Sequence, residues 1–237
     1  MQVNFVRNGY AQVYRHQTTQ VSSTGGETPI TAVDWVEKSE VVTKTPGRQP
    51  AIFVDRDGVI NQFLQPGDKI SDHLYPNAVE SLVRLMESTK LPVYIVSNQG
   101  HQCHGDPQLG VDSMIELADA VVAAGGRLSG ILYTTQPWGA RPSADTVSAA
   151  KPKPGLFLQA AQQDLGQFDL ADSYMIGDSV TDTIAAKKAH RDMTTIMVKT
   201  GRAGVDPKRH RDPDHWASDI EQAVDWIIAR ETSATSV

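Results

Sequence analysis

Cysteine is nearly absent from the 237-residue sequence, which contains only Cys103. One cysteine excludes an intrachain disulfide and a cysteine-rich zinc site. Long hydrophobic runs are missing too, since no stretch approaches the ~18 uninterrupted apolar residues of a membrane-spanning helix. Residues 1–10 include Gln2, Asn4, Arg7 and Asn8 and so lack the apolar core of a signal peptide. We therefore expect a soluble, cytoplasmic protein without a membrane partner.

Positive charge is in deficit. The chain has 22 Lys and Arg against 28 Asp and Glu, giving a formal net charge of −6 and a pI near 5.6. General nucleic-acid binders usually present a basic surface, so this balance argues against nucleic acid as a partner. The 40% hydrophobic and 21% charged residues are ordinary for a globular protein, and the length suffices for one α/β domain with an extension.

The first 49 residues differ in pattern from the rest. Residues 3–6 and 11–14 alternate as strands do, whereas residues 17–29 are rich in Thr, Ser and Gly and are typical of a loop. This segment is too short and polar to build its own core. We predict an extension over residues 1–49, one domain over residues 50–230 and a flexible tail over residues 231–237.

From residue 50 onward, strand-like and helix-like segments alternate. Apolar runs that fit buried strands are Ala51–Val54, Val93–Val96, Gly130–Tyr133, Ser173–Ile176 and Thr195–Val198. Helical spacing of apolar residues covers Val79–Met86, Met114–Val122, Leu156–Leu165, Val180–Ala189 and Ile220–Ala229. This alternation predicts an α/β fold with a Rossmann-like, mostly parallel sheet and helices on both faces.

Polar residues follow the apolar runs where the predicted strands end. Ligands of open parallel sheets bind beyond the carboxyl ends of the strands, so these residues are expected to converge. They are Asp55, Asp57 and Gly58 after the first run, Ser97 and Asn98 after the second, Asp178 and Ser179 after the fourth, Asp182 further on, and Lys151 in a turn before a helix.

Carboxylates, a hydroxyl and a cation in one place suit phosphoryl transfer. Asp55 and Asp57 share a pocket if the strand continues that far, because residues i and i+2 point the same way. Asp55 and Asp178 can hold Mg²⁺, which prefers hard oxygen ligands. One carboxylate can attack phosphorus to form an aspartyl-phosphate while its neighbour moves protons. Ser97 and Lys151 can bind the phosphoryl oxygens.

Two further positions are predicted to bind phosphate and one to support the site. Gly58 permits close backbone approach, so that amides can face a phosphate. Asn98, next to Ser97, is also expected to bind the phosphate. Ser179 is expected to cap the helix that follows it.

These motifs, in this order, resemble those of the haloacid dehalogenase-like (HAD) hydrolase superfamily over residues 50–230. The matching positions are the DxDG of Asp55–Gly58, Ser97, Lys151, and the GDxxxD from Gly177 to Asp182. The resemblance implies Mg²⁺, Asp55 as nucleophile, and Asp57 as general acid and base that also binds the metal through its backbone carbonyl. It gives Asp182 a role in orienting Lys151 or the metal shell. An acid at position 57 indicates a phosphatase or phosphomutase.

Longer stretches, "DRDGVIN", "SNQ", "GGRLSGILY" and "KPKPG", resemble the branch of histidinol-phosphatases and D-glycero-D-manno-heptose bisphosphate phosphatases. The chain departs from this branch at three places. Thr134–Gly139 replaces its zinc loop, so no zinc is expected. Ala150 stands where Arg usually precedes the motif lysine, and His104 stands where Arg is common. These departures argue against histidinol phosphate and heptose bisphosphate as substrates.

The spacing between the motifs leaves no room for a large cap domain, so we expect an open site. A lid could come from Gln136–Ala149, from residues 1–49, or from a second subunit of a homo-oligomer. Cys103, with His101 and His104, is a poor tetrahedral metal site and fits a loop near the substrate better.

The sequence thus predicts a Mg²⁺-dependent phosphomonoesterase acting through an aspartyl-phosphate on a small phosphorylated metabolite, most simply a sugar phosphate. One alternative is a phosphatase for nucleic-acid 3′ ends or nucleotides. The other is a non-catalytic binding protein that retains the fold.

Overall fold

The computed structural model describes residues 3–7, 11–16, 48–100, 107–135, 149–163, 168–205 and 212–234. The strands are β1 (Val3–Arg7), β2 (Ala11–His16), β3 (Ile52–Val54), β4 (Val93–Asn98), β5 (Gly130–Thr134), β6 (Tyr174–Gly177), β7 (Thr194–Val198) and β8 (His215–Ala217). The helices are η1 (Ile70–Asp72), α2 (Ala78–Thr89), α3 (Pro107–Ala123), α4 (Gly155–Gln163), α5 (Val180–Ala189), α6 (Arg202–Val205) and α7 (Ile220–Ala234).

All eight strands form one sheet, in the order β1-β2-β5-β4-β3-β6-β7-β8. Every pairing is parallel except that of β1 with β2, which confirms the predicted mostly parallel sheet. The five strands expected from residue 50 onward are all present. The two N-terminal strands were also expected from their alternation, and β2 joins them to the sheet by pairing with β5. The strand β8 was not anticipated.

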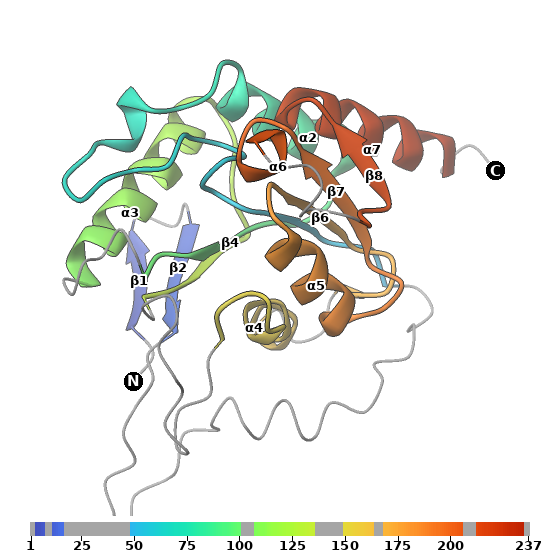
Figure 1. Cartoon of the computed structure of the whole chain (residues 1–237), viewed down its shortest axis with the longest axis horizontal. Coiled ribbons are helices and arrows are strands. Elements are labelled where there is room, and N and C mark those ends of the chain that lie inside the picture. The colour runs from blue at the N-terminus through green and yellow to red at the C-terminus, as the bar shows by residue number, and fades with distance from the viewer. Residues whose placement is uncertain are drawn as a thin grey trace, which may run out of the picture.

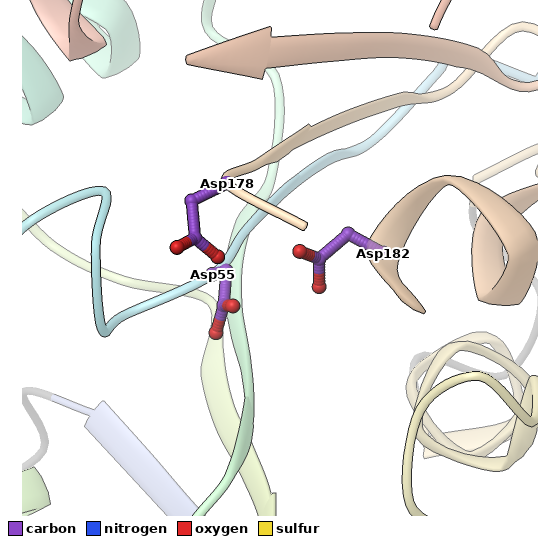
Figure 2. Close-up of side chains that lie close together, drawn as sticks. All are labelled: Asp55, Asp178 and Asp182. Atoms are coloured by element: carbon purple, nitrogen blue, oxygen red, sulfur yellow. The ribbon is translucent and has the colours of Figure 1, made fainter. Parts of the chain in front are cut away.

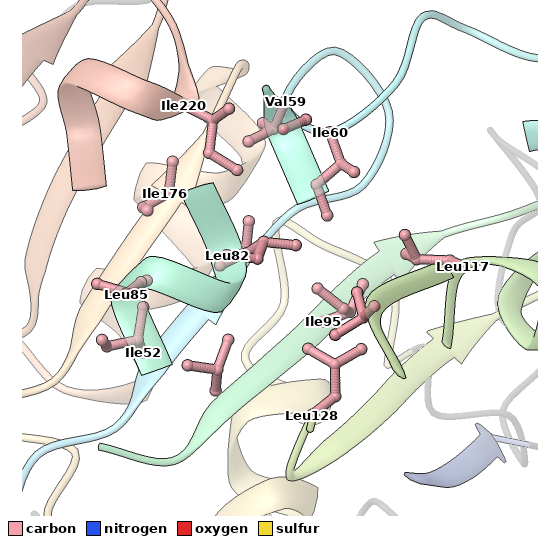
Figure 3. Close-up of a cluster of buried hydrophobic side chains, with 14 of the residues drawn as sticks. Ile52, Val59, Ile60, Leu82, Leu85, Ile95, Leu117, Leu128, Ile176 and Ile220 are labelled. Atoms are coloured by element: carbon pink, nitrogen blue, oxygen red, sulfur yellow. The ribbon is translucent and has the colours of Figure 1, made fainter. Parts of the chain in front are cut away.

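Helices cover both faces of the sheet, as predicted (Figure 1). Because side chains of a strand alternate between faces, Ile52 and Val54 of β3 join one apolar cluster and Phe53 joins another. The first cluster includes buried residues of α2, α3 and α7 (Figure 3). The second includes buried residues of α4 and α5. The sheet is therefore the middle layer of three, and its central strand β3 is fully buried.

Aromatic packing marks the second cluster. The ring of Phe53 lies 5.0 Å from that of Phe157 and 5.5 Å from that of Tyr94, measured between centroids. Phe168 packs edge-on against Phe53 at 5.9 Å. Rings of this size contribute a large buried area and favour such tilted and offset contacts. They join β3, the strand that leads into the first acidic motif, to β4 and α4.

The described parts of the connections between the motifs contain no cap domain. The link from β3 to β4 holds loops, η1 and α2, and the link from β4 to β5 holds α3 in its described part. The helix α7 continues to Ala234, past the expected boundary at residue 230. Among the described helices, none has the length and apolar character needed to cross a bilayer.

Candidate active site

The candidate site lies where the central strands end. Strands β4 and β6 flank β3 on either side and run parallel to it. Their carboxyl ends therefore lie at one edge of the sheet. Asp55 follows β3 directly, Ser97 belongs to the end of β4, and Asp178 follows β6. The convergence expected from the motif order is present at this edge.

The chain leaves strand geometry immediately after β3. The carbonyl of Arg56 accepts hydrogen bonds from the amides of residues 59, 60 and 61, so a tight turn begins there. Asp55 and Asp57 would point the same way only if the strand continued through them, and β3 ends at Val54. Each carboxylate instead has its own set of partners.

Asp57 is clamped by three side chains. Arg56 donates from Nε and Nη2 to its carboxylate at 2.8–3.1 Å. Asn61 Nδ2 donates to Oδ1 at 2.9 Å, and Gln99 Nε2 donates to Oδ2 at 2.8 Å. Gln99 also donates to Ser97 Oγ at 2.6 Å. The acid and the hydroxyl are thus held by one amide nitrogen.

Asp55 is paired with Lys151, which connects several elements. The Lys151 ammonium lies 2.9 Å from Asp55 Oδ1 and 2.6 Å from Asp182 Oδ1, and it donates to the Val96 carbonyl at 2.8 Å. Only 4% of Lys151 is exposed. Asn98 clasps the same residue through its backbone, accepting from the Lys151 amide at 3.0 Å and donating to its carbonyl at 2.9 Å.

The pKa values of Lys151 and Asp55 are both raised, but for different reasons. Burial alone would lower the pKa of Lys151, but the carboxylates of Asp182 and Asp55 raise that pKa above the usual lysine range. Burial raises the pKa of Asp55 well above its ordinary value, and Lys151 opposes that effect, while Asp182 and Asp178 add to it. Lys151 therefore stays charged, whereas the folded protein disfavours the charged form of Asp55.

Three of those carboxylates could hold a divalent cation. Oxygens of Asp55, Asp178 and Asp182 all lie within 4.8 Å of one another, and the side chains come from the ends of β3 and β6 and from α5 (Figure 2). Hard oxygen donors at this separation suit Mg²⁺. Burial first, and then the charge of Asp182, raise the pKa of Asp178 to about 7, against the opposing backbone amide of Arg202. A bound cation would relieve this repulsion.

Asp178 is held in a cradle of two glycines. A Cβ on Gly58 would lie 2.3 Å from Asp178 Oδ2, and one on Gly201 would lie 2.1 Å from the same atom. Gly58 also has φ +83°, a conformation that side chains disfavour. The amide of Arg202 donates to this oxygen at 2.7 Å. Glycine at both positions is thus required for the carboxylate to sit where it does.

Asp182 and Ser179 lie together at the start of α5. The Ser179 hydroxyl accepts from the Thr181 amide and Asp182 Oδ2 accepts from the Ser179 amide, which together form a capping box at the start of α5. The other oxygen of Asp182 faces Lys151. Because both oxygens have partners, Asp55 and Asp178 are the better candidates for metal ligands.

Ser97 and Asn98 are neighbours in β4, but their side chains have different partners. Ser97 is 1% exposed beside the Asp57 clamp, in keeping with a site role. Asn98 uses both ends of its side-chain amide on the Lys151 backbone, so it positions the lysine turn rather than presenting its amide to a phosphate. The expectation that Asn98 binds phosphate does not fit this geometry.

Several residues of the site were not anticipated from the sequence. Arg56 and Gln99 lie within the motifs, but the pattern alone gives them no role. Thr200 and Tyr75 lie outside every motif. Thr200 Oγ1 donates to the Gly58 carbonyl at 2.6 Å, and Tyr75 Oη donates to the Thr200 carbonyl at 2.8 Å. The "SNQ" stretch offered a signal for Gln99, since i and i+2 of a strand share a face, whereas the other contacts link distant segments.

Some predicted features lie outside the described residues. These are His101, Cys103, His104 and most of the loop predicted as a lid. The predictions that zinc is absent and that residues 136–149 or 1–49 form a lid therefore stay predictions.

Known proteins similar to this chain include several phosphatases. The HAD-hydrolase-like family matches residues 148–223. The chain is 30% identical over 183 residues to the D-glycero-β-D-manno-heptose-1,7-bisphosphate 7-phosphatase of Escherichia coli O6:H1, covering 76% of this chain and 88% of that relative. It is 28% identical over 185 residues to the enzyme of the same name from Yersinia pestis, covering 76% and 89%.

A solved structure shares the fold. The D,D-heptose 1,7-bisphosphate phosphatase of B. bronchiseptica, crystallised with magnesium and phosphate, superposes with a TM-score of 0.63 at 22% identity and covers 77% of this chain and 99% of that one. The similarity to the Escherichia coli enzyme spans 183 residues, which is 76% of this chain. The chain therefore belongs to the HAD-like hydrolases and is a phosphatase of that family.

Proposed function

We propose that the chain is a Mg²⁺-dependent phosphomonoesterase that hydrolyses a small sugar phosphate through an aspartyl-phosphate on Asp55. One observation carries the proposal. A buried lysine, Lys151, touches Asp55 and Asp182, and both lie within 4.8 Å of Asp178. Burying this much charge is costly unless it is paired or used. Phosphoryl transfer gives each of these charged groups a role.

In the first step an oxygen of Asp55 attacks phosphorus and the bond from phosphorus to the ester oxygen breaks. Asp57, in its protonated form, gives its proton to that oxygen, and the alcohol leaves. Lys151 stabilises charge on the phosphoryl oxygens and holds Asp55 in place, while the Ser97 hydroxyl donates to a phosphoryl oxygen.

In the second step water attacks the phosphorus of the aspartyl-phosphate. Asp57, now a carboxylate, accepts a proton from that water as the bond from Asp55 to phosphorus breaks. Inorganic phosphate leaves, and both acids return to their starting states. Asp57 thus changes role between the steps, which suits a carboxylate held in one orientation by several donors.

Asp55, Asp178 and the backbone carbonyl of Asp57 would hold Mg²⁺, which when bound neutralises phosphate charge as a Lewis acid. The geometry supports two of these ligands directly, because the carboxylates of Asp55 and Asp178 lie together with raised pKa values. Asp182 would orient Lys151 from outside the metal shell.

The relatives support a sugar phosphate as the substrate class, because their names specify a heptose bisphosphate. Ala150, His104 and Thr134–Gly139 differ from the pattern of that branch, so we propose that this enzyme's preferred sugar phosphate differs from theirs. A nucleic-acid 3′-phosphate is the second candidate, since the described connections between motifs hold no cap domain that would exclude a bulky substrate.

Phosphate release from a substrate panel tests this assignment. The purified chain with MgCl₂ is assayed on hexose monophosphates, heptose 1,7-bisphosphate and a 3′-phosphorylated oligonucleotide. We expect kcat/KM on the best sugar phosphate to exceed that on the oligonucleotide by roughly 100-fold. A preference for the oligonucleotide would replace the first candidate with the second. Failure to hydrolyse any ester would favour a binding protein instead.

Mg²⁺ should stabilise the fold in a pH-dependent manner. The pKa of Asp178 is raised from 3.8 to about 7, so the metal-free fold loses stability as pH rises through that window. Mg²⁺ competes with the proton for the carboxylate and therefore binds better above pH 7. We expect Mg²⁺ at ~100-fold excess over its Kd to raise Tm by roughly 5–10 °C at pH 8, and by much less at pH 6.

Two variants make that thermal measurement specific. Asp178→Asn should unfold at a higher temperature than wild type in metal-free buffer at pH 8 and should lose the response to Mg²⁺. Asp192→Asn changes a carboxylate that is 60% exposed and should respond as wild type does. Equal Mg²⁺ shifts at pH 6 and pH 8 would contradict the role of Asp178.

A further inference from the structure

Arg56 is an unusual residue for the fully buried place that it occupies. None of its surface is exposed, and it is the largest fully buried side chain among the described residues. A buried guanidinium is tolerated only when its donors are matched by acceptors. Nε and Nη2 point to Asp57, and Nη1 donates to Ser113 Oγ at 2.7 Å.

The Ser113 hydroxyl oxygen is free to accept this hydrogen bond. Ser113 lies on α3, is 5% exposed, and uses its own hydroxyl proton on the Gly110 carbonyl at 3.1 Å. Its oxygen lone pairs are therefore left to face the guanidinium. Ser113 thereby fixes the end of Arg56 that lies away from Asp57.

The helix α3 has a second anchor one turn later. Glu116 accepts from the amides of Ile70 and Ser71 at 3.0 and 3.2 Å. Residues three apart lie on the same face of a helix. Ser113 contacts Arg56, immediately before Asp57, and Glu116 contacts the start of η1, further along the same connection. The helix is thus tied both to the clamp on Asp57 and to the loop beyond it.

We propose that Arg56 and Ser113 are positioning residues for proton transfer by Asp57, with α3 as their support. This inference rests on the acid and base role proposed for Asp57. The carboxylate must present one oxygen to the ester oxygen in the first step and to water in the second. Arg56 fixes its rotation through three contacts, and Ser113 fixes Arg56.

The leaving group separates this role from a general structural one. When an aryl phosphate releases 4-nitrophenolate, the anion is stable and needs little proton donation. Phenolate is a poorer leaving group and depends more on the acid. Since kcat/KM reports the step in which the leaving group departs, a misplaced Asp57 should lower kcat/KM selectively on phenyl phosphate.

The test compares kcat/KM on phenyl phosphate and 4-nitrophenyl phosphate for Ser113→Ala in the full chain with MgCl₂. We expect loss of this hydrogen bond to a charged group to lower kcat/KM by about tenfold on phenyl phosphate and less than about twofold on 4-nitrophenyl phosphate. Ser113→Thr keeps the hydroxyl and should recover most of the lost rate. Ser81→Ala, another buried helical serine, on α2, should leave the ratio of the two rates unchanged.

Equal losses on both esters in Ser113→Ala, or no loss on either, would overturn the positioning role. Asp57→Asn, assayed on the same two esters, reports on the underlying mechanism. A selective loss in Asp57→Asn without one in Ser113→Ala would overturn the positioning role alone. No selective loss in Asp57→Asn would overturn both proposals.

Discussion

Asp55→Asn is expected to abolish phosphatase turnover, lowering kcat by roughly 10⁴-fold or more, because the amide cannot form the phosphoryl intermediate. The fold should persist. Burial raises the pKa of Asp55, so the charged form is disfavoured in the folded protein and its removal relieves repulsion from Asp182 and Asp178. The variant should therefore unfold at a temperature no lower than wild type in metal-free buffer at neutral pH. Phosphate release measures the loss of turnover, and calorimetry measures the unfolding temperature.

A matched substitution distinguishes the nucleophile from any other acid. Asp225→Asn, at an exposed carboxylate on α7 paired with Arg84, should keep wild-type turnover. Mass spectrometry of the wild type quenched during turnover should show one phosphoryl group on the peptide that contains Asp55. Retained turnover in Asp55→Asn would disprove the assignment.

Lys151→Met should destabilise the fold strongly, at a cost of about 3–5 kcal/mol in the free energy of unfolding near pH 7. The substitution removes the cation shared by Asp55 and Asp182 and leaves buried carboxylates unpaired. Turnover should fall as well, since charge on the phosphoryl group loses its partner. Denaturant unfolding and phosphate release measure both effects.

The pH dependence of the Lys151→Met defect identifies its cause. The carboxylates left unpaired can take up protons as the pH falls. The difference from wild type in the free energy of unfolding should therefore shrink toward pH 5. Lys153→Met, in the same turn, should change the free energy of unfolding by less than about 0.5 kcal/mol. A defect of equal size at pH 5 and pH 8 would indicate lost packing rather than lost charge.

The parts of the fold that follow a regular period could be predicted from the sequence. The five apolar runs became β3 to β7, because strands buried on both faces are continuous apolar stretches. The helix α5 starts and ends where expected, at Val180 and Ala189, since Ser179 and Asp182 mark its first turn in the sequence itself. The strand β8 escaped because it has three residues and includes His215, which gives no apolar run.

Contacts between distant segments could not be predicted in the same way. The separate orientations of Asp55 and Asp57 depend on a turn that begins at Arg56, and the apolar run before it does not indicate where strand geometry stops. The cradle of Asp178 needs Gly201, which the sequence places in a loop with no motif. Ser113 looks like any polar residue of an amphipathic helix until α3 is packed against the first motif.

The hydrogen bond from Thr200 to the Gly58 carbonyl spans 142 positions in the sequence. It joins the turn after the first acidic motif to the segment that follows β7, on which the Asp178 cradle also depends. Contacts of such long range are made only at the cost of the entropy of closing the intervening chain. A chain that ends before β7 would lack both Thr200 and Gly201, so we expect it to leave Asp178 and the Gly58 turn without their partners and to show no phosphatase activity.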